Sequence, residues 1–104
     1  AGSMDPVPIW NARDHINAAE SLSFSDHVLR LRETGIGVLQ AWSREWGRVG
    51  VATSGGVDSS FICAALACAA EPFDCATFAT SDPGGDERRY ARLVADTFAA
   101  RCAE

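Results

Sequence analysis

The feature that most constrains the fold is residues 51–66, VATSGGVDSSFICAAL, where a glycine- and serine-rich turn separates two apolar patterns. Residues 49–53 (VGVAT) are short, apolar and rich in β-branched side chains, which is typical of a strand buried on both faces of a parallel sheet. Residues 59–70 carry small and apolar side chains at helical spacing. A buried strand that turns directly into a helix predicts an α/β fold.

The segments on either side of this unit continue the alternation of helices and strands. We expect a helix from Ser25 to about Gly47, followed after the central unit by a second strand over 74–80 (DCATFAT) and a helix over 86–102. The expected order is helix–strand–helix–strand–helix, which corresponds to a partial Rossmann-like parallel sheet with a right-handed crossover. One face of the first helix is expected to be apolar, and it comprises Val28, Leu31, Leu39, Trp42 and Trp46.

The sequence divides into a polar lead-in, residues 1–24, and a folded part, residues 25–104. Residues 1–3 (AGS) precede Met4 and resemble an expression-vector scar, and residues 1–24 as a whole are expected to be an irregular lead-in with a short helical turn around 13–20. Residues 25–104 form the folded part. Because open parallel sheets usually carry about four to six strands, two strands suggest the first portion of a larger domain.

Composition excludes several classes of function. The net charge of −5 makes a basic nucleic-acid-binding face improbable, and no apolar run is long enough to cross a bilayer. The four cysteines form no CxxC pair and there are only two histidines, so a zinc site is not expected. We interpret Cys63 and Cys68 as buried, reduced residues of a cytoplasmic protein, with a disulfide framework as the alternative.

The turn itself has the composition of an anion site. A helix N-terminus presents backbone N–H groups without partners, and its peptide dipoles add about half a positive charge. Gly55 and Gly56 lack Cβ atoms and let the backbone approach an oxyanion, while Ser54, Ser59 and Ser60 offer hydroxyl donors. This combination predicts a phosphate-binding turn.

Asp58 adds a carboxylate that would repel a phosphate unless a cation lies between them. Mg²⁺ accepts carboxylate and phosphate oxygens together, so we assign Asp58 as a Mg²⁺ ligand. The alternative is an ordinary first-turn acid after an ordinary glycine turn. The GxxxxGK[ST] phosphate loop is excluded because all nine basic residues are arginines, and the turn does not contain GxGxxG.

The heptad SGGVDSS resembles the pyrophosphate-binding loop, SGGxDS/T, of the N-type ATP pyrophosphatases. Members have an adenine nucleotide alpha hydrolase-like fold, cleave ATP between the α and β phosphates, adenylate a carboxylate or carbonyl oxygen and release pyrophosphate. The resemblance implies ATP and Mg²⁺ as cofactors, with Asp58 on the metal. The nucleotide-binding residues that it implies are Ala52, Thr53, Ser54, Gly55, Gly56, Val57, Asp58, Ser59, Ser60 and Phe78. Residues 52–53 and 77–79 would line the adenine pocket through their backbone, although plain core packing is the alternative there.

A second segment, residues 86–95 (DERRYARLVA), is similar to a helix start in the asparagine-synthetase-like branch of that family. The branch includes asparagine synthetase, β-lactam synthetase and the lasso-peptide cyclases. The tryptophan-bearing helix at 41–46 and the segment 82–88 resemble the lasso cyclases most. Glu87 and Arg88 are expected to cap the helix and form surface pairs rather than touch substrate.

The resemblance implies an ATP-dependent carbon–nitrogen ligase that forms an isopeptide bond through an acyl-adenylate. Its partners would be a precursor peptide or a small carboxylate substrate, with leader-binding or protease proteins. The catalytic residues are expected beyond residue 104, so this chain alone is expected to be inactive. The alternatives are a glutamine-hydrolysing asparagine synthetase, a sulfur-transferring or NAD-synthesising pyrophosphatase and, in a different class, a non-catalytic nucleotide-binding or dimerising module.

Overall fold

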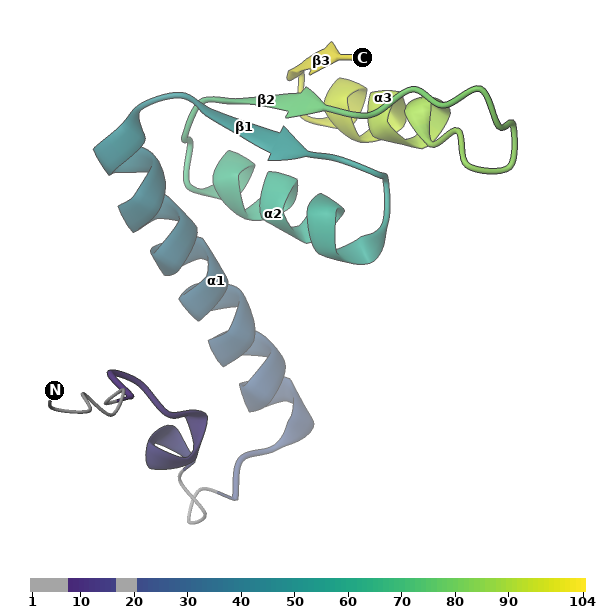
Figure 1. Cartoon of the computed structure of the whole chain (residues 1–104). Coiled ribbons are helices and arrows are strands. Elements are labelled where there is room, and N and C mark those ends of the chain that lie inside the picture. The colour runs from purple at the N-terminus through teal and green to yellow at the C-terminus, as the bar shows by residue number, and fades with distance from the viewer. Residues whose placement is uncertain (1–7, 17–20) are drawn as a thin grey trace, which may run out of the picture.

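A three-stranded parallel sheet with flanking helices forms the folded part of the chain, and the α/β fold class predicted from the sequence is confirmed (Figure 1). The computed structural model describes residues 8–16 and 21–104. The elements are a 3-10 turn, η1 (Ala12–His15), the helices α1 (Phe24–Trp46), α2 (Val57–Cys68) and α3 (Arg88–Thr97), and the strands β1 (Val49–Ala52), β2 (Phe73–Ala76) and β3 (Arg101–Ala103). Residues 17–20 of the predicted lead-in helix lie outside the described residues.

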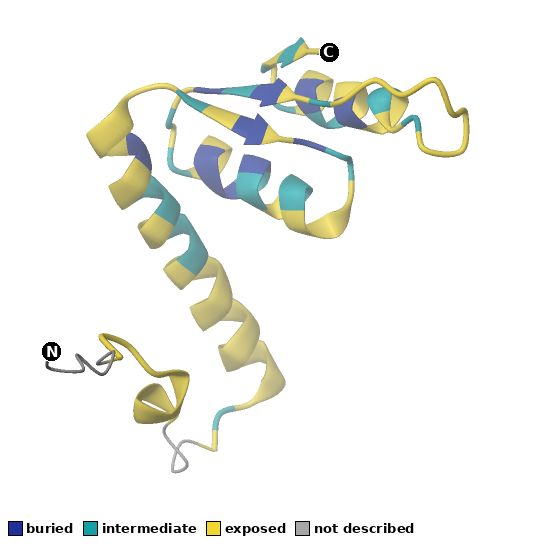
Figure 2. Ribbon diagram, viewed as in Figure 1, coloured by how far each residue is buried: buried dark blue, intermediate teal, exposed yellow. Residues whose placement is uncertain are grey.

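The strands lie in the order β1-β2-β3, and Val51 of β1 stands beside Cys75 of β2, which stands beside Cys102 of β3. The core forms where α2 and α3 pack against one face of this sheet (Figure 2). It comprises Val51, Cys63, Leu66, Phe73, Cys75 and Ala95. The alternate residues Gly50 and Ala52 are exposed, so the expectation that β1 is buried on both faces is wrong in the described structure.

Helix α1 begins at Phe24, one residue before the predicted start at Ser25, and its N-cap is Ser23. The Asp26 N–H donates to Ser23 Oγ over 3.2 Å, and the Ser23 N–H donates back to the Asp26 carboxylate. This capping box satisfies two of the N–H groups that a helix start leaves open. The helix remains continuous through Gly35, where a Cβ would lie 2.6 Å from Cζ of Phe61, so this glycine lets α2 pack closely.

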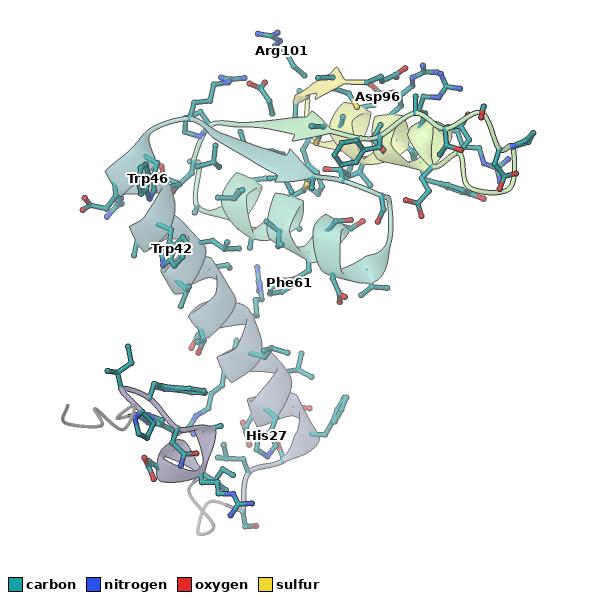
Figure 3. All side chains as sticks on the ribbon, viewed as in Figure 1. His27, Trp42, Trp46, Phe61, Asp96 and Arg101 are labelled. Carbon is teal, nitrogen blue, oxygen red and sulfur yellow. The ribbon has the colours of Figure 1, made fainter. Side chains whose placement is uncertain are left out.

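The predicted apolar face of α1 is not buried. Trp42 and Trp46 are 69% and 77% exposed, and Figure 3 shows both on the part of the helix that leads into β1. Ser43 is the only buried residue of α1, and Leu39 is half-buried. The helix therefore contacts the α/β unit through a narrow strip, and its large side chains face solvent.

The C-terminal part differs most from the sequence prediction. The helix expected over 86–102 is α3, only residues 88–97, and a third strand follows it. Ala99 has φ +53, and the N–H of Ala100 donates to the Ala95 carbonyl, which closes the helix and reverses the chain. The predicted second strand is also shorter, since β2 ends at Ala76.

The cysteines are free thiols, and the expectation of reduced residues agrees with the described structure. Cys63 is buried as expected, with its Sγ 4.0 Å from Sγ of Cys75, whereas Cys68 is exposed and its predicted burial is wrong. Burial raises the pKa of the Cys63 thiol to about 11, and the neighbouring Cys75 adds to the shift. Among the described residues, no helix has the length and apolarity to cross a membrane.

Candidate functional site

The predicted phosphate-binding turn lies at the edge of the sheet where β1 and β2 end and α2 and α3 begin (Figure 1). Thr53, which directly precedes the turn, is held in place by two hydrogen bonds. The Thr53 N–H donates to the Ala76 carbonyl over 2.8 Å, and its buried hydroxyl donates to the Val51 carbonyl over 2.9 Å. The edge formed by the carboxyl ends of parallel strands is where ligands of open α/β sheets bind.

The serines of the turn hold its shape from within. Ser54 Oγ accepts a hydrogen bond from the Gly56 N–H over 3.2 Å, and Ser59 Oγ donates to the Gly56 carbonyl over 3.3 Å. The two hydroxyl oxygens are 3.4 Å apart. Ser54 and Ser59 therefore have a structural role in addition to the phosphate contacts that the sequence predicts for them.

Helix α2 starts without a cap. Its N-cap residue is Gly56, which has no side chain, and the first helical hydrogen bond runs from the Ser60 N–H to the Gly56 carbonyl over 3.0 Å. Within the described structure, the N–H groups of Val57, Asp58 and Ser59 have no acceptor. Three open donors at the positive end of a helix dipole form a favourable site for an oxyanion.

The two glycines turn out to have different roles. Gly55 has φ +82, and a Cβ there would lie 3.0 Å from the Tyr90 carbonyl carbon and closer still to Tyr90 Cβ. This glycine is therefore required by the first turn of α3, which packs directly on the loop, and not only by a ligand. At Gly56 a Cβ would meet nothing nearer than Ser54 Oγ, at 3.2 Å, so this position leaves the backbone open to approach.

Asp58 is exposed at the start of α2, in the place that the Mg²⁺ assignment requires. In the part of the chain that the structure describes, no group of three His, Cys, Asp or Glu side chains could hold a metal ion. A single carboxylate fits Mg²⁺ only where phosphate and water oxygens complete the shell, which is how this ion is usually held. The assignment of Asp58 to a metal stays a prediction.

The predicted adenine-contacting residues are not gathered into one wall. Thr53 is buried, Ala52 is exposed on the open face of the sheet, and Phe78 is 87% exposed. The N–H of Thr77 donates to the Ala103 carbonyl over 2.9 Å, so strand pairing already uses it. Of the predicted nucleotide-binding residues, 54–60 are consecutive in the turn and the start of α2 and are half-buried or exposed.

Helix α3, which begins within the segment DERRYAR, contributes Tyr90, a residue that was expected on the apolar face of this helix and not at the site. Its contact with Gly55 links two segments that are 35 positions apart, and no local pattern signals such a pairing.

Asp86 pairs with Arg88 over 2.6 Å, which lowers the pKa of the Asp86 carboxyl to about 2. Arg88 thus forms the surface pair expected of it, whereas the Glu87 side chain makes no cap hydrogen bond.

One cavity borders the loop, and a second lies at the start of α3. An apolar groove of about 600 Å³ runs between α2 and α3, with Gly55, Val57, Phe61 and Phe98 among its lining residues. The second is a polar cavity of about 360 Å³, and it is lined by Pro83, Gly84, Asp86, Arg89 and Tyr90.

Comparison with known proteins identifies the family. The family model described as asparagine synthase matches residues 42–104, which is more than half of the chain and includes the turn and the three strands. No curated protein and no solved structure matches the chain. The family match agrees with the asparagine-synthetase-like resemblance read from SGGVDSS and DERRYARLVA. The chain therefore belongs to the asparagine synthase family.

Proposed function

We propose that the turn at residues 54–60 binds the polyphosphate of ATP in an enzyme that activates a carboxylate and forms an amide bond. Membership of the asparagine synthase family supports ATP-dependent ligation in general. The finer chemistry that we propose is attack of a carboxylate oxygen on the α-phosphorus with loss of pyrophosphate, followed by attack of an amine on the acyl-adenylate with loss of AMP.

The observation that carries the proposal is the uncapped start of α2. The N–H groups of Val57, Asp58 and Ser59 have no acceptor among the described residues, and Gly56 leaves them accessible. A polyphosphate oxygen accepts such bonds with the advantage of its charge, at about 1.5–3 kcal/mol each. Bound Mg²⁺ would screen the charge on the departing pyrophosphate, and Asp58 is the chain's own ligand for it.

The amine and the carboxylate are further parts of the proposal. We propose isopeptide bond formation within a precursor peptide, as in lasso-peptide cyclisation, because the segment at 82–88 and the tryptophan-bearing residues 41–46 resemble that group. The family match does not favour this function over a glutamine-hydrolysing asparagine synthetase. In both cases the same turn would hold the pyrophosphate portion of ATP.

Calorimetry with Mg-ATP tests the nucleotide site directly. We expect submillimolar binding by the chain and at least a tenfold loss in Asp58→Asn, since the substitution removes the charged metal ligand. Asp96→Asn is the matched control. It makes the same change of charge at an exposed residue near the C-terminal end of α3. Absence of binding to the unsubstituted chain, together with a dimer in light scattering, would support the non-catalytic assembly module instead.

The product formed in the presence of ATP, by this chain or by a longer protein that contains it, identifies the carboxylate and the amine that are joined. A precursor peptide that becomes lighter by one water in the presence of ATP indicates cyclisation. Free asparagine formed from aspartate and glutamine indicates an asparagine synthetase. Formation of neither product, with intact ATP, would contradict the proposed ligase chemistry.

A further inference from the structure

We propose that Arg89 is a cationic contact of the polyphosphate and that Tyr90 positions it beside the loop. The inference rests on the proposed nucleotide site and adds to it a residue from α3, a helix that the loop motif does not include. Three observations support it: the contacts that join Arg89 to the loop through Tyr90, the lack of a carboxylate partner for Arg89, and the position of Arg89 in the first turn of α3.

The first observation places α3 against the site. Tyr90 packs on Gly55 so closely that a Cβ at Gly55 would lie 3.0 Å from the Tyr90 carbonyl carbon. The guanidinium carbon of Arg89 lies 4.3 Å from the centre of the Tyr90 ring, and Arg89 donates a hydrogen bond to the Tyr90 hydroxyl. Tyr90 thus contacts both the loop and the guanidinium.

The second observation is that the charge of Arg89 is not neutralised by any described carboxylate. On the same helix, Arg88 pairs with Asp86 and Arg92 pairs with Glu104. No described acid lies within ion-pair distance of Arg89. A cation over an aromatic face keeps its charge and all but one of its donors available, so the guanidinium can still bind an oxyanion bidentately.

The third observation is that the position disfavours a cation unless an anion is bound nearby. Arg89 lies in the first turn of α3, where the helix dipole is positive and where the N-cap residue, Glu87, supplies the nearest acidic side chain in the sequence. A positive charge there destabilises the helix. Local choices that oppose stability are expected at functional sites. A polar cavity of about 360 Å³, lined by Arg89 and Tyr90 among others, leaves room beside the guanidinium.

The choice of arginine also fits the composition. The chain has no lysine, so any cation that it offers to a phosphate is an arginine. The guanidinium is planar and always charged, and it matches two phosphate oxygens at once. Tyr90 contributes by holding this group, and it is a positioning residue rather than a ligand.

The test is calorimetry with Mg-ATP and with Mg-pyrophosphate on the full chain, alongside thermal melts of each variant. Arg89→Ala should weaken both ligands about tenfold or more, as expected for loss of a charge-assisted hydrogen bond. Arg89→Lys should recover part of the affinity. Arg101→Ala, which removes the same charge at an exposed residue that Figure 3 shows directed away from the sheet, should change binding less than twofold.

Stability separates a ligand contact from a structural role. Removing an unpaired cation from a helix start should leave the melting temperature of Arg89→Ala unchanged or raise it, whereas loss of a structural stacking contact would lower it. Equal effects of Arg89→Ala and Arg101→Ala, or unchanged affinity in Arg89→Ala while Asp58→Asn loses binding, would overturn the role of Arg89 and leave the nucleotide site standing. No binding by the unsubstituted chain would instead contradict the proposed function itself.

Discussion

Replacing Gly55 with alanine tests the packing of α3 on the loop. The new Cβ would lie 3.0 Å from the Tyr90 carbonyl carbon and 3.2 Å from Tyr90 Cα, which are backbone atoms that cannot rotate away. An alanine at φ +82 also carries about 1–2 kcal/mol of backbone strain. Overpacking adds about 1–3 kcal/mol. We therefore expect Gly55→Ala to lower the free energy of unfolding by about 2–5 kcal/mol.

Urea denaturation followed by circular dichroism measures this loss. A small domain is stable by only about 5–15 kcal/mol, so the expected change is a large part of the whole. Gly37→Ala is the matched control, since a Cβ there would meet nothing within 4 Å, and alanine in a helix interior should raise stability by about 1 kcal/mol. Equal stability of Gly55→Ala and the unsubstituted chain would refute the packing argument.

Two further predictions concern a helix start and a titrating carboxyl. Ser23→Ala removes the capping box of α1 and should lower the free energy of unfolding by about 1 kcal/mol, measured by urea denaturation, with Ser25→Ala, which lies outside the box, as the control. The pKa of the Asp86 carboxyl is lowered from 3.8 to about 2 by Arg88, so its stabilising contribution is present above pH 3.8 and is lost as pH falls through about 2. The melting temperatures of the unsubstituted chain and Asp86→Asn should accordingly differ at neutral pH and converge near about pH 2, and a difference that persists there would contradict the assignment.

The central part of the fold could be predicted because its signals are local. The strand before Ser54, the turn and the start of α2 near Val57 follow each other directly in the sequence, and each has a composition typical of its structure. Strand β3 could not be predicted, because the chain reverses at Ala99 with φ +53, where neither glycine nor proline marks the end of the helix. The sequence around residues 99–103 reads as a continuation of the helix.

The burial of α1 could not be read from periodicity either. Trp42 and Val28 share a helical face, but they remain 69% and 50% exposed, whereas Ser43 is buried. Periodicity shows which residues share a face, whereas burial depends on what else the fold places there. The same limit applies at the candidate site, where the loop is evident in the sequence but its contact with Tyr90 depends on the tertiary fold.

The hydrogen bonds among Ser54, Gly56 and Ser59 affect both how fast and how tightly the turn can bind an anion. Because these bonds fix the turn before any ligand arrives, the conformational entropy of ordering it is lost during folding rather than during binding. An incoming anion then meets donors that already converge, so its capture requires no slow rearrangement of the main chain. Preorganisation of this kind raises affinity without adding a contact.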